Sequence, residues 1–176
     1  MDVVPAALRC FVLAAVVLTA ACSTPAEPTV SAAPLSNTFA SPEAVARAVL
    51  SALAERNVDR LRALPLSEAE FRGHIWPELP TSRPERNVPF EYAWGQLKQQ
   101  SDAFLQQTIA RYAGKRLTFV SARFTGDTTP YASFSVMRES EIVATDEAGR
   151  DLILRLYGSV MVKDGRYKVF SYVIDD

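Results

Sequence analysis

The hydrophobic pattern of the chain changes period at about Lys115, and this change limits the fold class. Between Ser41 and Tyr112, apolar residues recur at intervals of three and four, as they do on one face of a helix. From Leu117 to Ile174 they alternate, as in strands that bury one face. Helices followed by strands predict an α+β fold, in which three to four N-terminal helices pack on a curved four-stranded antiparallel sheet.

The helix boundaries are marked by residues that suit helix ends. Ser41 is a favourable N-cap, and Pro42 is a favourable first helical residue. Ser67 and Glu70 have the spacing of a capping box, and Gly114 follows the longest helical stripe as a C-terminal cap. The sequence therefore predicts helices over residues 41–56, 58–64, 67–75 and 91–112.

The segment 76–90 interrupts the helical pattern with four prolines. Because proline fixes φ and lacks an N–H donor, we expect no regular helix or strand there. Long loops inside a domain often carry function, so the aromatic residues around this segment are candidates for a binding surface: Trp76, Phe90, Tyr92 and Trp94. Alternatively, these rings hold the segment against the core.

The second half of the chain predicts strands joined by hairpins. The expected strands cover residues 117–124, 131–143, 152–162 and 167–174, with turns near Gly126, Gly149 and Gly165. The last strand is apolar on both faces. It is therefore either a covered strand of the sheet or the interface of a homodimer.

A long helix that leads into a curved antiparallel sheet resembles the nuclear transport factor 2 superfamily, whose domains are cone-shaped. The resemblance covers residues 42–174 and rests on the order of elements. The chain departs from it at the proline-rich segment, which stands where those domains have a short strand. The resemblance implies a pocket at the mouth of the cone. In the enzymes of the superfamily a pocket histidine or aspartate acts as general base.

The N-terminus has the layout of an export signal. Arg9 precedes an apolar run over 11–18, which is followed by small residues and Cys22. Residues 1–25 resemble the lipobox of bacterial lipoproteins, although Thr19 stands where that family prefers leucine. The resemblance implies cleavage between Ala21 and Cys22 and acylation of Cys22.

Two other interpretations of this N-terminus are an ordinary secretory signal and a permanent transmembrane helix. The apolar run is shorter than the ~20 residues that cross a bilayer, which disfavours the second. We expect a signal peptide over 1–21, a lipidated, disordered tether over 22–40 and one α+β domain over 41–176. Ser23 implies the outer membrane facing the periplasm, if the source is Gram-negative.

The rest of the composition excludes several classes of function. With Cys10 in the signal peptide, the mature chain retains one cysteine and no disulfide. The net charge of −1 provides no basic surface for nucleic acid.

We predict no metal site and no cofactor, because no ligand set or phosphate-binding loop is recognisable. His74, the only histidine, and Glu70 four residues before it form the one candidate acid–base pair.

These patterns predict a cell-envelope lipoprotein with a non-enzymatic binding or assembly domain tethered to a membrane face. One alternative is a carrier of a small apolar ligand in a cone-shaped pocket. Another is an isomerase-like or cyclase-like enzyme with His74 as general base. The expected partners are the membrane, through the lipid anchor, and either an envelope protein or an apolar small molecule.

Overall fold

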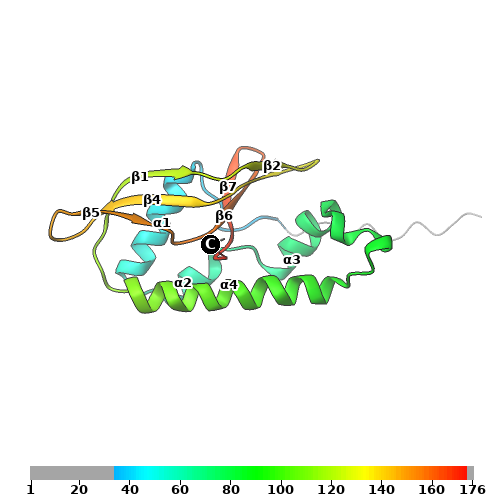
Figure 1. The fold of residues 1–176 in the computed structure, drawn as a ribbon, viewed down its shortest axis with the longest axis horizontal. Coiled ribbons are helices and arrows are strands. Elements are labelled where there is room, and N and C mark those ends of the chain that lie inside the picture. The colour runs from blue at the N-terminus through cyan, green and yellow to red at the C-terminus, as the bar shows by residue number, and fades with distance from the viewer. Residues whose placement is uncertain (1–33, 174–176) are drawn as a thin grey trace, which may run out of the picture.

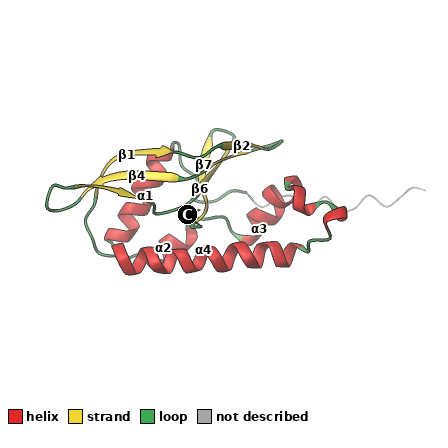
Figure 2. Ribbon diagram, viewed as in Figure 1, coloured by secondary structure: helices red, strands yellow, loops and turns green. Residues whose placement is uncertain are grey.

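The computed structural model describes residues 34–173 of the chain, and the predicted signal peptide and lipidation site lie outside these residues. The predicted α+β class is confirmed: the helices precede the strands, and Figures 1 and 2 show the strands as one layer beside the helices. The α-helices are α1 (Pro42–Ala54), α2 (Val58–Ala63), α3 (Glu68–Glu70) and α4 (Phe90–Tyr112).

The sequence features at the helix starts act as predicted. The Ser41 side chain accepts a hydrogen bond from the Ala44 N–H at 3.2 Å and so caps α1. Ser67 and Glu70 form the reciprocal capping box at α3. After α3 the backbone continues as a π-helical turn, Phe71–Ile75. Each cap satisfies backbone donors that lack a partner inside the helix.

The proline-rich segment has neither an α-helix nor a strand, as predicted. It forms three single 3₁₀ turns, each with proline at its first or second position: Trp76–Glu78, Pro80–Ser82 and Pro84–Arg86. Glu78 joins the segment to the sheet, because its carboxylate accepts a hydrogen bond from the Ser133 N–H at 3.0 Å. The segment is therefore held at one end of the domain.

The strands differ in number from the prediction. Within residues 34–173, seven strands form two antiparallel sheets, one of order β1-β4-β5 and one of order β2-β3-β6-β7. The strands are β1 (Thr118–Phe124), β2 (Thr128–Pro130), β3 (Ser135–Met137), β4 (Ser140–Thr145), β5 (Asp151–Leu154), β6 (Ser159–Lys163) and β7 (Arg166–Ser171). The four expected strands become seven, because each of the two longest divides in two and β2 forms between the first two expected strands. They belong to two sheets in place of one.

The division follows from a bend that crosses neighbouring strands. Glu139 lies between β3 and β4 with φ of 56°, which an extended strand cannot contain. Backbone hydrogen bonds continue across the bend: Thr125 N–H donates to Glu139 O at 3.0 Å, and Ser140 N–H donates to Gly158 O at 3.1 Å. The two sheets therefore meet along one line, which produces the expected curvature.

In the part of the chain that the structure describes, the core consists of two clusters. The larger joins the apolar face of α1, with Val45 and Val49 fully buried, to both sheets and to Leu105 of α4. The smaller lies under the proline-rich segment and contains Phe71 and Phe90. Figure 1 shows α1 between the strands and α4.

The folded domain begins before Ser41. Phe39 pairs with Tyr167 of β7 through two backbone hydrogen bonds of 2.8 and 2.9 Å, and the Asn37 amide donates to Ala63 O at 2.9 Å. Residues 36–39 are therefore not part of the disordered tether that the sequence predicted over 22–40. The physical reason is that β7 is the last strand of its sheet, and residue 39 binds its free edge.

The contacts at β7 are also relevant to the prediction that the last strand is the interface of a homodimer. Along its outer edge, β7 forms bridges at Phe39 and at Pro65, both from the same chain. The outer edge of β7 is thus covered at these two positions within one molecule, and the homodimer stays a prediction.

Candidate ligand cavity

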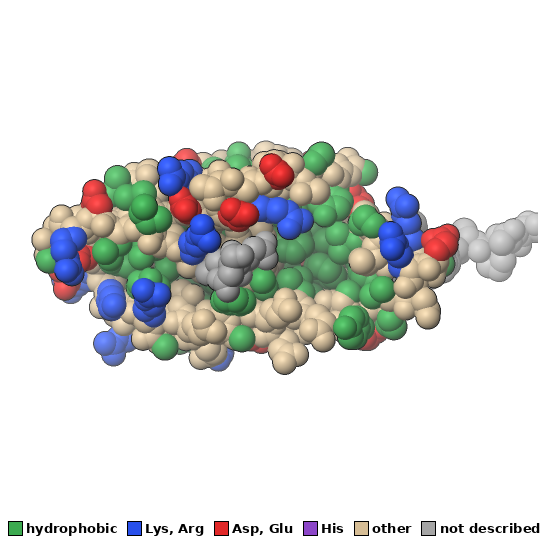
Figure 3. All heavy atoms as spheres, viewed as in Figure 1, with side chains coloured by type: hydrophobic (Ala, Val, Ile, Leu, Met, Phe, Trp, Pro, Cys, Tyr) green, Lys and Arg blue, Asp and Glu red, His purple; other side chains and the backbone are tan. Residues whose placement is uncertain are grey.

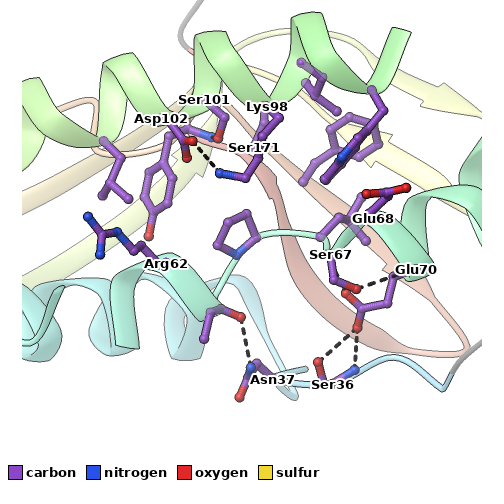
Figure 4. Close-up of a pocket in the computed structure, with 18 residues that line it drawn as sticks. Ser36, Asn37, Arg62, Ser67, Glu68, Glu70, Lys98, Ser101, Asp102 and Ser171 are labelled. Carbon is purple, nitrogen blue, oxygen red and sulfur yellow. Dashed lines mark hydrogen bonds and ion pairs between the residues drawn. The ribbon is translucent and has the colours of Figure 1, made fainter. Parts of the chain in front are cut away.

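A cavity of about 480 Å³ lies between α4, the end of β7 and the connection from α2 to α3 (Figure 4). Pro65 follows α2 and forms a bridge with Val169 of β7, and Ser67 caps α3. The connection between the two helices forms one wall of the cavity beneath α4. The walls are mainly apolar, and they include Ala63, Pro65, Leu66, Trp94, Leu97 and Phe170.

Helix α4 presents one of its faces to this cavity. Trp94, Leu97, Ser101 and Leu105 follow one another at intervals of three, four and four residues, which places them on one side of the helix. A smaller cavity of about 160 Å³ shares Leu97 and the end of β7 with the larger one. Figure 3 shows hydrophobic side chains in a hollow between the four-stranded sheet and α4.

A buried ion pair holds one wall of the cavity. Glu70 accepts hydrogen bonds from Ser36 N–H at 2.7 Å and from Ser67 N–H at 2.8 Å, and the Lys168 ammonium lies 3.4 Å from its second oxygen. Lys168 is fully buried and also donates to Ser36 O at 2.7 Å. These contacts, which we call the Glu70 clamp, join the N-terminal segment, α3 and β7. Figure 4 shows the hydrogen bonds of Glu70 to Ser36 and Ser67.

The Glu70 carboxyl of the clamp stays ionised. Burial raises the pKa of Glu70, but the N–H groups of Ser67 and Ser36 and the charge of Lys168 outweigh burial and leave the pKa below its usual value. Burial also lowers the pKa of Lys168, against the opposing effect of Glu70. Glu70 is therefore a poor proton acceptor at neutral pH.

The other charged residues of the lining are also paired. Glu68 lies 3.0 Å from Arg72, Lys98 bonds Asp102 one turn later on α4, and Arg62 lies 3.9 Å from Asp59. Within residues 34–173, every charged side chain of the cavity wall thus has a partner of opposite sign. The cavity presents no net charge to a ligand.

Two buried serines add hydroxyl groups to the apolar lining. Ser101 is 6% exposed and Ser171 is 3% exposed. Ser101 Oγ accepts a hydrogen bond from Tyr172 N–H at 3.0 Å, which leaves its own proton for another acceptor. The Ser171 hydroxyl has no hydrogen-bond partner in the described part of the chain. These are the polar groups at which a ligand can be held.

The candidate acid–base pair is not arranged as the sequence suggested. Both oxygens of Glu70 are occupied by the clamp. His74 lies half-buried in the π-helical turn after α3, and it does not line the cavity. The cavity therefore contains one member of the pair, and that member is fully hydrogen-bonded.

The four candidate aromatic residues separate into three environments. Trp76 and Phe90 pack edge to face with ring centres 5.6 Å apart, and Phe90 is buried. Trp94 packs on Phe71 at 5.4 Å and lines the cavity, whereas Tyr92 is 62% exposed. Only Trp94 of the four reaches the site.

The remaining site residues were only weakly indicated by local sequence patterns. Ser101 is a polar residue inside the apolar stripe of the longest helix, which is the pattern of a hydroxyl directed inward. Lys168 stands in an otherwise apolar strand, but no pattern indicated its partner, because Glu70 lies 98 positions earlier.

A buried tyrosine lies outside the cavity. Tyr157 is fully buried, and its hydroxyl has no partner among residues 34–173. Burial, and secondarily the charge of Glu43, raise the pKa of Tyr157. The group is neutral and belongs to the larger core cluster.

Comparisons with protein-family models, with curated proteins and with solved structures find no significant match. The resemblances to bacterial lipoproteins and to the nuclear transport factor 2 superfamily therefore stay predictions. No group of three or more potential metal ligands occurs within residues 34–173. None of the helices in this range has the length and hydropathy needed to cross a bilayer.

Proposed function

We propose that this protein is a cell-envelope lipoprotein whose single domain binds a small, mainly apolar molecule in the cavity beneath α4. The observation that carries the proposal is the cavity itself. Its volume of about 480 Å³ falls within the ~300–1,000 Å³ of small-molecule sites, and such sites combine apolar walls with a few buried polar groups.

The position of the tether supports a role at a membrane. Ser36 and Asn37, which line the cavity, follow Cys22 by fourteen and fifteen residues. A chain of that length spans at most about 50 Å when fully extended. A lipid on Cys22 would therefore keep the cavity close to the membrane surface, from which apolar molecules partition. In a Gram-negative cell this would be the periplasmic face of the outer membrane.

Two observations favour this function over the others. An enzyme of the isomerase type needs a general base in the pocket, but Glu70 has a lowered pKa and both of its oxygens accept hydrogen bonds. The other two carboxylates of the lining, Glu68 and Asp102, form ion pairs with Arg72 and Lys98. An assembly module needs an exposed apolar patch, and of the aromatic residues around the proline-rich segment only Tyr92 is exposed.

Ligand binding can be tested with the uncharged dye Nile red, on a chain from residue 22 that carries Cys22→Ser. The substitution Leu97→Trp would fill the cavity beneath α4. Gln99→Trp is the matched control, because Gln99 is exposed on the same helix and outside the cavity. We expect wild-type binding and unchanged binding by the control, with at least a tenfold loss for Leu97→Trp. No binding by the wild type, or equal binding by Leu97→Trp, would overturn the proposal.

The anchor is tested separately by the intact mass of the protein purified from membranes. We expect the mass of residues 22–176 plus acyl groups. We also expect a Cys22→Ala variant to remain uncut. An unmodified mass together with normal processing of Cys22→Ala would show that the protein is a secreted carrier without an anchor.

A further inference from the structure

We infer that the ligand of this cavity is an uncharged amphiphile that carries a hydrogen-bond acceptor, such as an ester or ether oxygen, and that Ser171 and Ser101 donate to this acceptor. The inference rests on the proposed function and specifies the class of ligand.

The absence of free charge on the lining argues against an ionic ligand. Glu68, Lys98 and Arg62 each have a partner of opposite charge beside the cavity. Glu70 is shared among Ser36, Ser67 and Lys168, so it has no free lone pair for a cation. An ionic ligand in this apolar space would lose its hydration and gain no unpaired counter-charge, so its binding is unfavourable.

The two serines argue against a purely hydrocarbon ligand. The Ser171 hydroxyl makes no hydrogen bond within the described residues and borders the cavity, so a hydrocarbon that covered it would leave its donor without a partner. Ser101 supplies a second donor, because its oxygen already accepts from Tyr172 N–H. Both residues face the same space, one from β7 and one from α4. A ligand oxygen between them would satisfy both donors.

The size of the cavity limits the apolar part of the ligand. The volume of about 480 Å³ lies in the lower part of the ~300–1,000 Å³ typical of small-molecule sites. A twelve-carbon chain with a small polar end suits a site of this size. The inferred ligand is therefore a single-chain or compact molecule.

The test uses four compounds that share an unbranched twelve-carbon chain and differ at its end: methyl dodecanoate, dodecanoate, dodecylammonium and dodecane. Displacement of Nile red gives the affinity of each. We expect methyl dodecanoate to bind at least tenfold more tightly than either ion and about fivefold more tightly than dodecane. Equal or tighter binding of an ion would overturn the inference, although the proposed function would stand. Failure to bind both the dye and all four compounds would instead reject the proposed function.

Ser171→Ala is the informative variant, because it removes a hydroxyl that makes no hydrogen bond within the described domain and therefore leaves the fold intact. We expect it to abolish the preference for methyl dodecanoate over dodecane and to leave dodecane binding unchanged. Ser121→Ala is the control, since Ser121 is exposed on β1. Ser101→Ala should act in the same direction. An unchanged preference in both cavity variants would overturn the assigned role of the serines.

Discussion

The Glu70 clamp provides the sharpest test of how the domain is held together, through the substitution Glu70→Gln. Glutamine keeps an acceptor oxygen for Ser36 but cannot neutralise Lys168, and its amide nitrogen cannot accept from Ser67 N–H. Lys168 is fully buried, so its ammonium would remain in the core without a counter-charge. Breaking a buried ion pair in this way costs about 3–5 kcal/mol.

This loss is large compared with the total stability of a domain, which is about 5–15 kcal/mol. For a domain of this size it lowers Tm by roughly 6–20 °C. Thermal and urea denaturation at pH 7 measure the effect. Glu68→Gln is the control: its ion pair with Arg72 is exposed, so we expect a change below about 1 kcal/mol.

The effect of Glu70→Gln depends on pH in a defined direction. The pKa of Glu70 is lowered in the folded state, so its stabilising contribution is present above its usual value of 4.5 and is lost as pH falls through the folded pKa. The difference between wild type and Glu70→Gln should therefore shrink in acid. The pKa of Lys168 is also lowered, so the uncompensated charge in the variant is relieved as pH rises and Lys168 loses its proton.

A double substitution distinguishes the ion pair from simple packing. In Glu70→Gln with Lys168→Met no buried charge is left without a partner, so we expect the double variant to be more stable than Glu70→Gln alone. A double variant whose loss equals the sum of the two single losses, or a Glu70→Gln variant within about 1 kcal/mol of the wild type, would refute this reasoning.

Two further predictions concern stability away from the cavity. Tyr157→Phe removes a buried hydroxyl that has no partner in the described part of the chain, so we expect the free energy of unfolding to rise by about 1 kcal/mol; a loss of stability in urea denaturation would contradict this. Gly95→Ala should stabilise α4 by about 0.5–1 kcal/mol, because a Cβ there meets no atom within 4 Å. Gly114→Ala should instead destabilise by about 1–2 kcal/mol, since Gly114 has φ of +81° and its Cβ would lie 2.5 Å from Arg56; equal Tm changes in the two variants would refute this contrast.

Local sequence determined the helical half of the fold. Ser41, Ser67 with Glu70, and the prolines of the segment 76–90 act on backbone groups within three or four positions of themselves. Such contacts are the same in almost any tertiary context. The helix starts and the proline-rich interruption could therefore be predicted from the sequence alone. The change of period near Lys115 similarly determined the α+β class.

Tertiary structure decided where the strands break, where the domain begins and what lines the cavity. The bend at Glu139 depends on backbone partners at Thr125 and Gly158, and the start of the domain depends on the free edge of β7. The clamp joins Ser36, Glu70 and Lys168, which are separated by 34 and 98 positions. No local pattern encodes such pairs, because their free energy arises only when distant segments exclude water together.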